Sequence, residues 1–370
     1  MTEIRVCIAG LRGIPGVMGG IESHCEQIFP RLKEMGAEYD ITIIGRSPYT
    51  AGGNFRGVRV VALPAFRNKY LEAISNTILA VLYARFALKA HILHIHGIGP
   101  ALLGPLARIL GMKLVVTHHG QDFKRQKWNA LAKAVLRLGE RCATAAAHRI
   151  IVVSKSVTEE LHRRHPKLGL RLSYIPNGAT EFPAHTARDD ESGILGRFGL
   201  EPGRYILAVG RLVPEKGFHF LIEAFMAARP GCKLAIAGAA DHADDYSRAL
   251  LAHAGEDIRF CGFQPHDVLR VLYRHAALFV LPSTHEGLPI AALEAANAGV
   301  PVLLSDIQPN LDIELAPANY FPTGDIAALG DKLLANYETF RVDREAIAGR
   351  FNWGRVSEAT RQVYRTLASA

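Results

Sequence analysis

The chain has 370 residues, of which 49% are hydrophobic and 21% are charged, and its formal net charge at pH 7 is +8. This size and composition suit two α/β domains with large cores and exclude a disordered or low-complexity chain. The five cysteines are scattered and form no C-x-x-C pair, which argues against a disulfide framework or a zinc site and fits a reducing cytosol.

Charge is divided unevenly along the chain. Residues 1–178 contain 25 Lys and Arg against 11 Asp and Glu, whereas the remainder contains 18 against 24. The basic first half is expected to meet an anionic or membrane-bound partner, and we expect a cytoplasmic protein at the inner face of the cytoplasmic membrane. Nucleic acid is the rival partner, but the sequence contains no recognised nucleic-acid motif, so none is expected.

The chain opens with a predicted β-loop-α-β unit, as a doubly wound domain does. Its elements are a strand over residues 4–10, a helix over 21–35 and a strand over 41–45. Gly19 and Gly20 lie directly before the helix, where the backbone would come close to a ligand phosphate or sugar, although a flexible loop is the alternative. The glycines do not spell G-x-G-x-x-G, so no dinucleotide fingerprint is present.

Polar residues follow a later strand of this half, at the end where open α/β sheets bind ligands. Further strands are predicted over 58–63, 92–96, 113–117 and 150–154, the last being the final strand of the domain, with helices over 69–90 and 123–147. His118, His119 and Asp122 directly follow the strand at 113–117. The basic helix over 123–147 has Trp128 near its start, which suits a membrane interface or an anionic acceptor, or else a solvated helix with its tryptophan in the core.

The segment 174–178, Y-I-P-N-G, is typical of a domain exit, because proline ends a strand and Asn-Gly forms a turn. Alternating strands and helices then resume, with strands over 205–210, 234–238, 258–260, 277–281 and 300–305. We therefore expect two Rossmann-like α/β domains, 1–177 and 178–352, and a terminal helix over 353–370 that packs on the first domain.

Two carboxylates mark the segment 281–294, which joins a buried strand to a helix. Glu286 lies on the loop and Glu294 lies eight residues further, a span of about 12 Å along a helix. That distance matches the reach from a sugar across a diphosphate to a ribose, and the Gly287 and Leu288 amides would open the helix and attract phosphate. The pattern predicts a nucleotide-sugar pocket; the alternative is a capping carboxylate and a solvated helix face.

Two cations follow the first strand of the second half. Arg211 and Lys216 would neutralise a diphosphate through charge-assisted hydrogen bonds. No D-x-D motif stands in a suitable place, and Asp241, Asp244 and Asp245 are expected to be solvated. We therefore expect no metal and no cofactor, since Arg, Lys and a helix N-terminus can stabilise a departing diphosphate without Mg²⁺.

The segments G-R-L-V-P-E-K-G (210–217), G-F (262–263) and E-G-L-P-I-A-A-L-E (286–294) resemble the family-4 (group 1) retaining glycosyltransferases of the GT-B fold. G-L-R-G-I-P-G-V-M-G-G-I-E-S and H-H-G-Q-D-F-K-R-Q-K-W are similar to a subgroup that builds bacterial surface polysaccharides, including rhamnosyltransferases. The resemblance implies two Rossmann-like domains facing across a cleft. It also implies retaining transfer of a hexose or deoxyhexose from a nucleoside-diphosphate sugar to a glycan or lipid-linked acceptor.

The same resemblance implies roles for residues of the second half. Arg211 and Lys216 would hold the donor diphosphate, and Glu286 would contact hydroxyls of the transferred sugar. The amides of 287–288 (Gly287 and Leu288) would lie near that sugar or the phosphate. Glu294 would bind the ribose.

Roles for the remaining residues follow in the same way. Gly262 and Phe263 would border the base, and Gly19 and Gly20 would approach the donor phosphate from the first domain. His119 matches the strand-end histidine that lines the donor sugar in this family. On the acceptor side we place His118, Asp122 and Trp128. The family's favoured reaction is front-face substitution, in which the leaving phosphate oxygen helps to deprotonate the acceptor hydroxyl.

Three other functions compete with glycosyl transfer. A nucleotide-sugar 2-epimerase of the same fold would hold the same donor, but it would leave the basic first half without a role. A non-catalytic sugar-nucleotide-binding component of an export machine would not need the Arg/Lys and Glu/Glu set. An NADP oxidoreductase would need the dinucleotide fingerprint that the first loop lacks.

Overall fold

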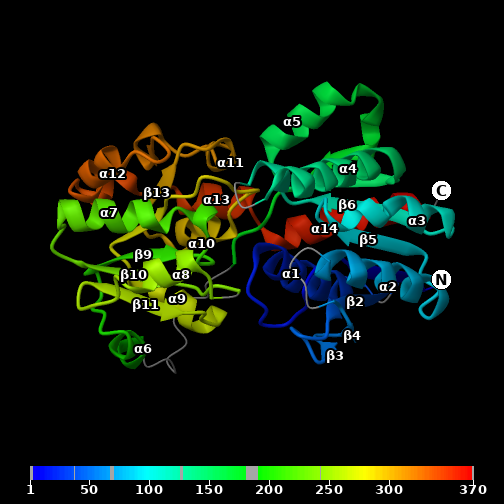
Figure 1. Cartoon of the computed structure of the whole chain (residues 1–370), viewed down its shortest axis with the longest axis horizontal. Helices are drawn as coiled ribbons and strands as arrows, with labels where there is room; N and C mark the ends of the chain where they lie inside the picture. The colour runs from blue at the N-terminus through cyan, green and yellow to red at the C-terminus, as the bar shows by residue number, and fades with distance from the viewer. Residues whose placement is uncertain are drawn as a thin grey trace. The chain divides into compact units, whose positions relative to one another are not determined.

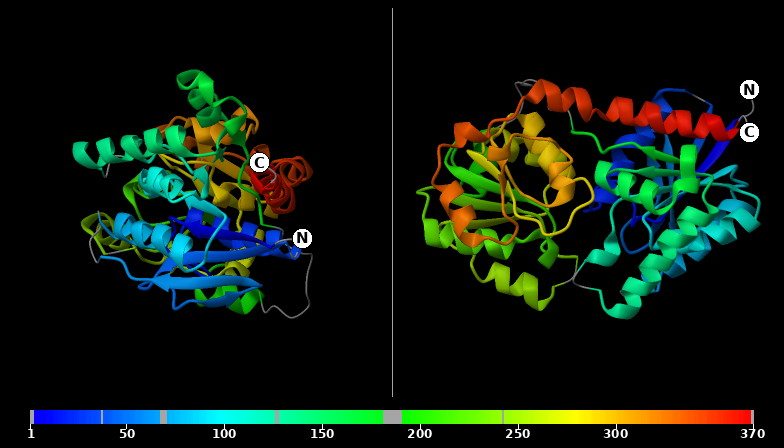
Figure 2. Two further views of the ribbon diagram at one scale, coloured as in Figure 1. Left: turned by 90° about the vertical axis from the view of Figure 1, so that its right-hand side faces the viewer. Right: turned by 90° about the horizontal axis from the view of Figure 1, so that it is seen from above.

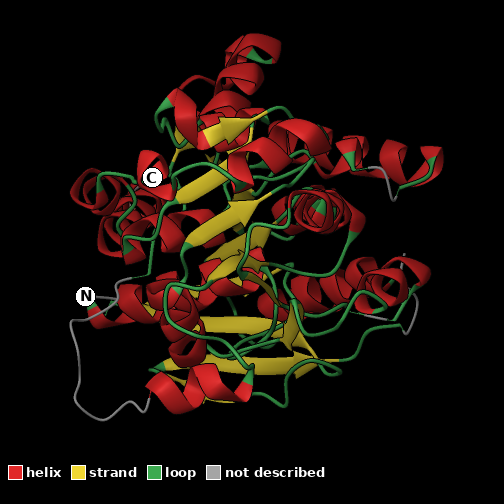
Figure 3. Ribbon diagram, turned by 90° about the vertical axis from the view of Figure 1, so that its left-hand side faces the viewer, coloured by secondary structure: helices red, strands yellow, loops and turns green. Residues whose placement is uncertain are grey.

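The computed structural model describes residues 3–36, 38–66, 71–125, 128–180, 191–241 and 243–368. The chain forms two compact units, one of Met1–Asn177 with Trp353–Ala370 and one of Gly178–Asn352 (Figure 1). Each unit is a predominantly parallel sheet between helices (Figure 3), so the expected α/β class with two Rossmann-like units is confirmed.

In the described part of the first unit, an eight-stranded sheet runs in the order β3-β4-β2-β1-β5-β6-β7-β8, parallel except for the β3–β4 pair. Its strands are β1 (Ile4–Ala9), β2 (Tyr39–Arg46), β3 (Gly53–Phe55), β4 (Val58–Leu63), β5 (Ile92–His96), β6 (Lys113–His118), β7 (Arg149–Val152) and β8 (Leu172–Tyr174). The strand order reverses between β1 and β5, and ligands of such sheets bind outside the carboxyl ends at this switch point.

Helices of the first unit begin at side-chain caps where the sequence supplies them. The helices are α1 (Gly20–Glu34), α2 (Glu72–Phe86), α3 (Gly104–Ile109), α4 (Ala130–Ala146), α5 (Lys155–Arg164) and α14 (Trp353–Ala368), with 3₁₀ turns at Pro100–Leu103, Asp122–Lys124 and Pro166–Arg171. Asn129 accepts a hydrogen bond from the Ala132 amide and Ser154 from the Val157 amide, so α4 and α5 start directly after them.

Three expectations for this half need correction. The helix expected over 123–147 begins only at Ala130, because Asn129 caps it there; residues 126–127 lie outside the described part. The helix expected over 69–90 corresponds to α2, which covers Glu72–Phe86 and so ends earlier than expected; residues 67–70 lie outside the described part. The strand at 150–154 is not the last one, because β8 follows it and pairs with β7.

The second unit contains, in its described residues, a six-stranded parallel sheet in the order β11-β10-β9-β12-β13-β14. Its strands are β9 (Tyr205–Val209), β10 (Lys233–Ala237), β11 (Ile258–Gly262), β12 (Leu278–Leu281), β13 (Val302–Ser305) and β14 (Tyr320–Phe321). Its helices are α6 (Glu191–Arg197), α7 (Phe218–Ala228), α8 (Asp245–Leu251), α9 (His266–His275), α10 (Ile290–Ala298), α11 (Gln308–Leu311), α12 (Ile326–Leu333) and α13 (Arg344–Arg350), with 3₁₀ turns at Pro214–Lys216, Pro317–Asn319 and Tyr337–Phe340. The near-continuous apolar strands are buried because helices cover both faces.

The terminal helix α14 (red in Figure 2) returns to the first unit and packs on α1, as expected. Its Trp353 and Tyr364 are buried, and the Ser357 hydroxyl donates to the Ile28 carbonyl at 3.5 Å. The Tyr364 hydroxyl is hydrogen-bonded at 2.6 Å to Nδ1 of His94, a buried residue of β5. The last helix therefore completes the core of the unit that the first residues begin.

We expect Tyr364→Phe to lower the free energy of unfolding by about 1–3 kcal/mol, because a buried imidazole nitrogen loses its partner. Urea denaturation followed by fluorescence measures the change. Tyr83→Phe is the matched control, since the structure gives no hydrogen bond of the Tyr83 hydroxyl within its described residues. Equal losses in both variants would contradict the assigned role of the Tyr364 hydroxyl.

Candidate functional site

In the second unit the predicted cations and one predicted acid lie on neighbouring loops. Arg211 and Lys216 follow β9, and Glu286 follows β12; these two strands pair directly in the sheet. Gly217 makes the approach of the loops possible: its φ is +67°, and a Cβ there would lie 2.0 Å from the Pro282 carbonyl oxygen. Only glycine tolerates both conditions.

Lys216 and Glu286 form an ion pair, with Nζ 2.6 Å from Oε1. The Ser283 hydroxyl donates to the same carboxylate oxygen at 2.6 Å. The side chains are 18% and 10% exposed, so solvent screens the pair little while one face of it stays accessible. The pair presents a fixed positive and a fixed negative group side by side at the carboxyl end of the sheet.

Arg211 is paired as well, with Nη1 2.8 Å from Oδ2 of Asp241. This corrects the expectation that Asp241 is solvated, whereas Asp244 is exposed as expected. Asp241 is three-quarters buried against Arg211, and Asp244 caps α8 by accepting from the Ser247 amide at 2.8 Å. Asp245 is fully exposed, as expected. Asp241 therefore holds Arg211 in place after β9.

Glu294 lies within α10 and is 5% exposed. Its Oε1 accepts from the Thr180 hydroxyl at 2.7 Å, and its Oε2 accepts from the Tyr273 hydroxyl at 3.3 Å. Burial raises the pKa of Glu294, and the nearby His266, Thr180 and Tyr273 offset part of that rise. Glu294 is thus neither a helix-surface charge nor a cap, and hydroxyl groups are the partners that its carboxyl group already binds.

The backbone between the two glutamates differs from the expectation in one respect. Helix α10 begins at Ile290, with Pro289 at its cap position, so the Gly287 and Leu288 amides lie in the preceding loop and do not open the helix. Proline has no backbone N–H to donate and is tolerated at the start of a helix, which is where Pro289 lies. Of the expected base-bordering residues, Gly262 ends β11 and Phe263 follows it, with its side chain 46% exposed.

In the first unit, Gly19 is the cap residue of α1 and Gly20 its first residue. A Cβ at Gly19 would lie 2.1 Å from the Glu22 carboxylate, whereas a Cβ at Gly20 would meet nothing within 4 Å. Glu22 is buried and accepts from the Arg12 amide at 3.0 Å and from its Nε at 3.2 Å. The Arg12–Glu22 pair therefore shapes the glycine loop, and the backbone at Gly20 is open to a ligand.

His119 belongs to a cluster of histidines at the carboxyl ends of β5 and β6. Its Nε2 lies 2.9 Å from Nδ1 of His96, and its ring meets the His24 ring edge-on, with the centroids 4.7 Å apart. Nδ1 of His24 is 2.8 Å from Oδ1 of Asn177, and the His24 ring also contacts Trp353 edge-on. His24 thus touches the residues at which the chain leaves and re-enters the first unit.

These histidines are neutral at pH 7. Burial lowers the pKa of His24 to about 4 and that of His94 to about 3. Burial, followed by the neighbouring imidazoles, lowers the pKa values of His96 and His119 well below the usual range. A neutral imidazole can donate one hydrogen bond and accept another, which suits contact with sugar hydroxyls.

Of the three residues expected on the acceptor side, His118 has its hydrogen-bond partners in the core of the first unit. His118 points into the core, where Nε2 lies 3.1 Å from Oε2 of Glu140 and Nδ1 accepts from the Gly120 amide at 3.3 Å. Both ring nitrogens are therefore occupied, so His118 is placed for packing. Asp122 is paired with Arg125 at 2.7 Å, and Trp128 is half-buried.

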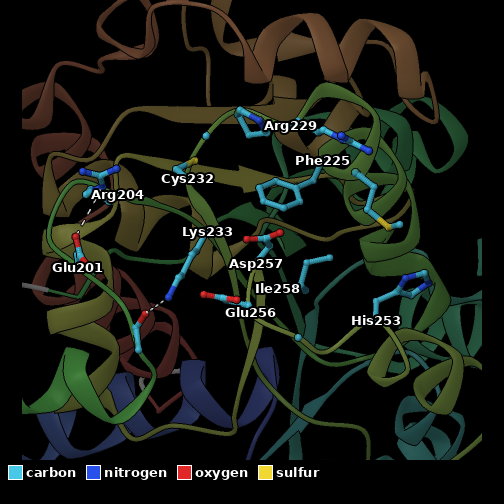
Figure 4. A pocket seen from close by; sticks show the side chains of 15 residues that line it. Glu201, Arg204, Phe225, Arg229, Cys232, Lys233, His253, Glu256, Asp257 and Ile258 are labelled. Carbon is cyan, nitrogen blue, oxygen red and sulfur yellow. Dashed lines mark hydrogen bonds and ion pairs between the residues drawn. The ribbon is translucent and has the colours of Figure 1, made fainter.

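The second unit also has a cavity of about 1000 Å³ at the opposite end of its sheet (Figure 4). Arg204, Lys233 and Ile258 line it, and they lie at the amino ends of β9, β10 and β11. Lys233 donates to the Gly199 carbonyl at 2.7 Å. The residues predicted from sequence follow the carboxyl ends instead, where parallel sheets bind their ligands, so we do not assign the donor to this cavity.

Sequence reasoning missed several residues that hold the predicted ones. His24 and His96 surround His119, Ser283 binds Glu286, and Thr180 binds Glu294. His96 ends a predicted strand next to the strand of His119, so adjacency of those strands could have signalled it. Thr180 lies more than 110 residues from Glu294, and no local pattern could connect them.

Two Rossmann-like units, each with polar and charged groups after the carboxyl ends of its strands, are the arrangement of the GT-B glycosyltransferases. Residues 18–180 match the family model "Glycosyltransferase Family 4", and residues 197–337 match "Glycosyl transferases group 1". The chain is a group 1 glycosyltransferase. An uncharacterized glycosyltransferase of Methanocaldococcus jannaschii is 27% identical to it over 376 residues, with 95% of each chain covered.

Solved structures share the fold over the whole length. Sucrose-phosphate synthase from Thermosynechococcus elongatus has a TM-score of 0.79 at 20% identity, covering 99% of this chain and 100% of that chain. Anabaena HepE in complex with UDP-glucose has a TM-score of 0.74 at 17% identity, with both chains fully covered. None of the helices that the structure describes is both long and apolar enough to span a membrane.

We expect Glu294→Gln to gain stability relative to the unsubstituted protein as pH rises above about 4.5. The raised pKa means that the folded state binds more protons than the unfolded state just above the ordinary carboxyl pKa, so the unfolding free energy falls as pH rises through that window. The amide cannot ionise and escapes this loss. Thermal denaturation from pH 4 to 8 measures the difference, with exposed Glu256→Gln as the control; parallel curves for the unsubstituted protein and Glu294→Gln would contradict it.

Proposed function

We propose that the protein transfers a hexose or deoxyhexose from a nucleoside-diphosphate sugar to a glycan or lipid-linked acceptor, with retention, in surface-polysaccharide biosynthesis. The observation that carries the proposal is the ion pair between Lys216 and Glu286. Lys216 follows β9, on the same loop as Arg211, and Glu286 follows β12. The motifs shared with the family-4 enzymes of the rhamnosyltransferase-like subgroup support the retaining stereochemistry and the pathway.

Arg211 and Lys216 would bind the donor diphosphate. Each cation is held by one carboxylate, Asp241 or Glu286, so the diphosphate would approach positive groups that are already oriented. As the bond between the anomeric carbon and the phosphate oxygen breaks, negative charge grows on the leaving group, and fixed cations stabilise it more than mobile water does. We propose that Arg211 and Lys216 stabilise the negative charge of the leaving group, with no metal ion or cofactor.

Glu286 would accept hydrogen bonds from hydroxyls of the transferred sugar. Its second carboxylate oxygen makes no hydrogen bond among the described residues, whereas Oε1 binds Lys216 and Ser283. Glu286 is therefore a positioning group in the proposal, and it forms no covalent intermediate. The acceptor oxygen would bond to the anomeric carbon on the face that the diphosphate leaves, and its proton would pass to the leaving phosphate oxygen.

The remaining donor contacts follow from the carboxyl ends of the strands. Glu294 would bind the ribose hydroxyls, because its oxygens already bind hydroxyl groups of Thr180 and Tyr273. Gly262 and Phe263 would border the base. From the first unit, His119 would contact the sugar, and Gly19 and Gly20 would leave room for the donor phosphate.

Lys216→Ala should lower kcat/KM about a hundredfold or more, since one fixed donor at developing charge is worth that much. Glu286→Gln should also lower it, because a neutral amide binds sugar hydroxyls and orients Lys216 less strongly. The donor is first identified by thermal shift with UDP-, GDP- and dTDP-sugars, and transfer is then followed by release of the nucleoside diphosphate.

Lys233→Ala is the matched control, because Lys233 lines the cavity at the other end of the same sheet, and we expect its activity to stay within twofold. NMR of the product gives the anomeric configuration. Turnover by Lys216→Ala near that of the control would refute the site assignment. Donor binding without transfer to any acceptor would favour a non-catalytic component, and interconversion of the donor would favour the epimerase.

We also propose that the first unit binds the inner face of the cytoplasmic membrane, which would bring the enzyme to a lipid-linked acceptor. Helix α2 exposes an apolar face made of Ile78, Leu79, Leu82 and Phe86, with Phe86 67% exposed. These residues recur at helical spacing and share one side of the helix. The net charge of +14 over residues 1–178 favours anionic lipid headgroups, and apolar side chains beside basic ones suit the interface.

The double substitution Leu82→Glu with Phe86→Glu should abolish most sedimentation with vesicles that contain anionic phosphatidylglycerol. Apolar contact is replaced by charge that the same headgroups repel. Met226→Glu, at an exposed position of the second unit, is the control and should sediment like the unsubstituted protein. Equal sedimentation of all three proteins would exclude α2 as the membrane-binding face.

A further inference from the structure

Three imidazoles converge in the first unit from three separate elements. His24 comes from α1, His96 ends β5 and His119 directly follows β6. Strands β5 and β6 pair in register, which places His96 and His119 side by side. One ring nitrogen from each histidine lies within 4.8 Å of the corresponding nitrogens of the other two.

We propose that His24, His96 and His119 bind one divalent transition-metal ion. Imidazole nitrogen is a preferred ligand of Co²⁺, Ni²⁺, Cu²⁺ and Zn²⁺, and three such ligands leave further coordination positions for water. Mg²⁺ and Ca²⁺ prefer oxygen ligands and should not bind here. The site is distinct from the Arg211 and Lys216 pair of the second unit, which handles negative charge without a metal in the function proposed above.

The spacing of two of the three ligand atoms already suits a coordinated ion. Nδ1 of His96 and Nε2 of His119 are 2.9 Å apart. Two neighbouring ligands of a six-coordinate ion are separated by about 3.0 Å when each metal–nitrogen bond is about 2.1 Å. The ion would replace the proton that these two nitrogens share, and that proton would move to the other nitrogen of the same ring, so both imidazoles stay neutral.

The surroundings fix the ligand atoms as they do in known metal sites. The Asn177 side-chain oxygen accepts from Nδ1 of His24, which leaves the lone pair of Nε2 for an ion. His96 is fully buried, and its Nε2 has no hydrogen-bond partner within the described residues. With Nδ1 bound to the ion, Nε2 of His96 would carry the proton of the neutral imidazole.

Metal binding here would inhibit the enzyme. An ion on the trio takes the lone pair of His119 and adds positive charge where the neutral imidazole would meet a sugar hydroxyl. This consequence rests on the proposed function, whereas the binding itself does not. A divalent transition ion and the donor sugar would therefore compete for His119.

The test is titration of the untagged full-length protein with Co²⁺, followed by visible absorption and by the metal content after gel filtration. We expect one equivalent bound, with d–d bands characteristic of nitrogen ligation. His119→Ala and His24→Gln should each weaken binding at least tenfold. His119 is only half-buried, so its truncation should not prevent folding, and circular dichroism verifies this for both variants.

His219→Ala is the matched control, because it removes a half-buried histidine of the second unit and should leave the Co²⁺ stoichiometry unchanged. Absence of bound Co²⁺ in the unsubstituted protein, or equal binding by the His119→Ala variant, would overturn the site. If Co²⁺ binds to the unsubstituted protein but does not inhibit transfer, the metal site is supported and the role of His119 in the proposed function is contradicted.

Discussion

The second unit depends on the close approach of two loops at Gly217. Because the Gly217 α-carbon lies against the Pro282 carbonyl, Lys216 can reach Glu286, and the Thr284 amide can donate to the Glu215 carbonyl at 2.9 Å. Parallel pairing of β9 and β12 brings the two loops to the same edge of the sheet. A side chain at Gly217 would separate the cation from the carboxylate and remove the fixed charge pair.

The first unit is organised in the same way around neutral groups. Histidines on β5, after β6 and on α1 pack ring against ring, and burial keeps them uncharged. The second unit fixes charges, whereas the first fixes hydrogen-bonding imidazoles. This division suits the proposed reaction, in which the leaving group is anionic and the transferred sugar is neutral, and the imidazoles of the first unit suit transition-metal ions.

His24 links that cluster to the connections of the chain. Its ring contacts Asn177, the last residue before the chain leaves the first unit, and Trp353, the first residue after it returns. The terminal helix that begins at Trp353 also reaches His94 through Tyr364. Asn177 and Trp353, at which the chain leaves and re-enters the first unit, therefore help to hold His24 and the histidine cluster in position.

The sequence by itself determined the α/β class, the return of the last helix, and the position of Arg211, Lys216 and Glu286 after strand ends, because apolar runs, glycines and charges mark these features locally. Only the tertiary structure decided which groups meet. It paired Lys216 with Glu286, buried Glu294 against Thr180, turned His118 into the core and gathered three histidines around one point. Such contacts depend on strand order and on loop approach across many residues, and a one-dimensional pattern does not encode either of them.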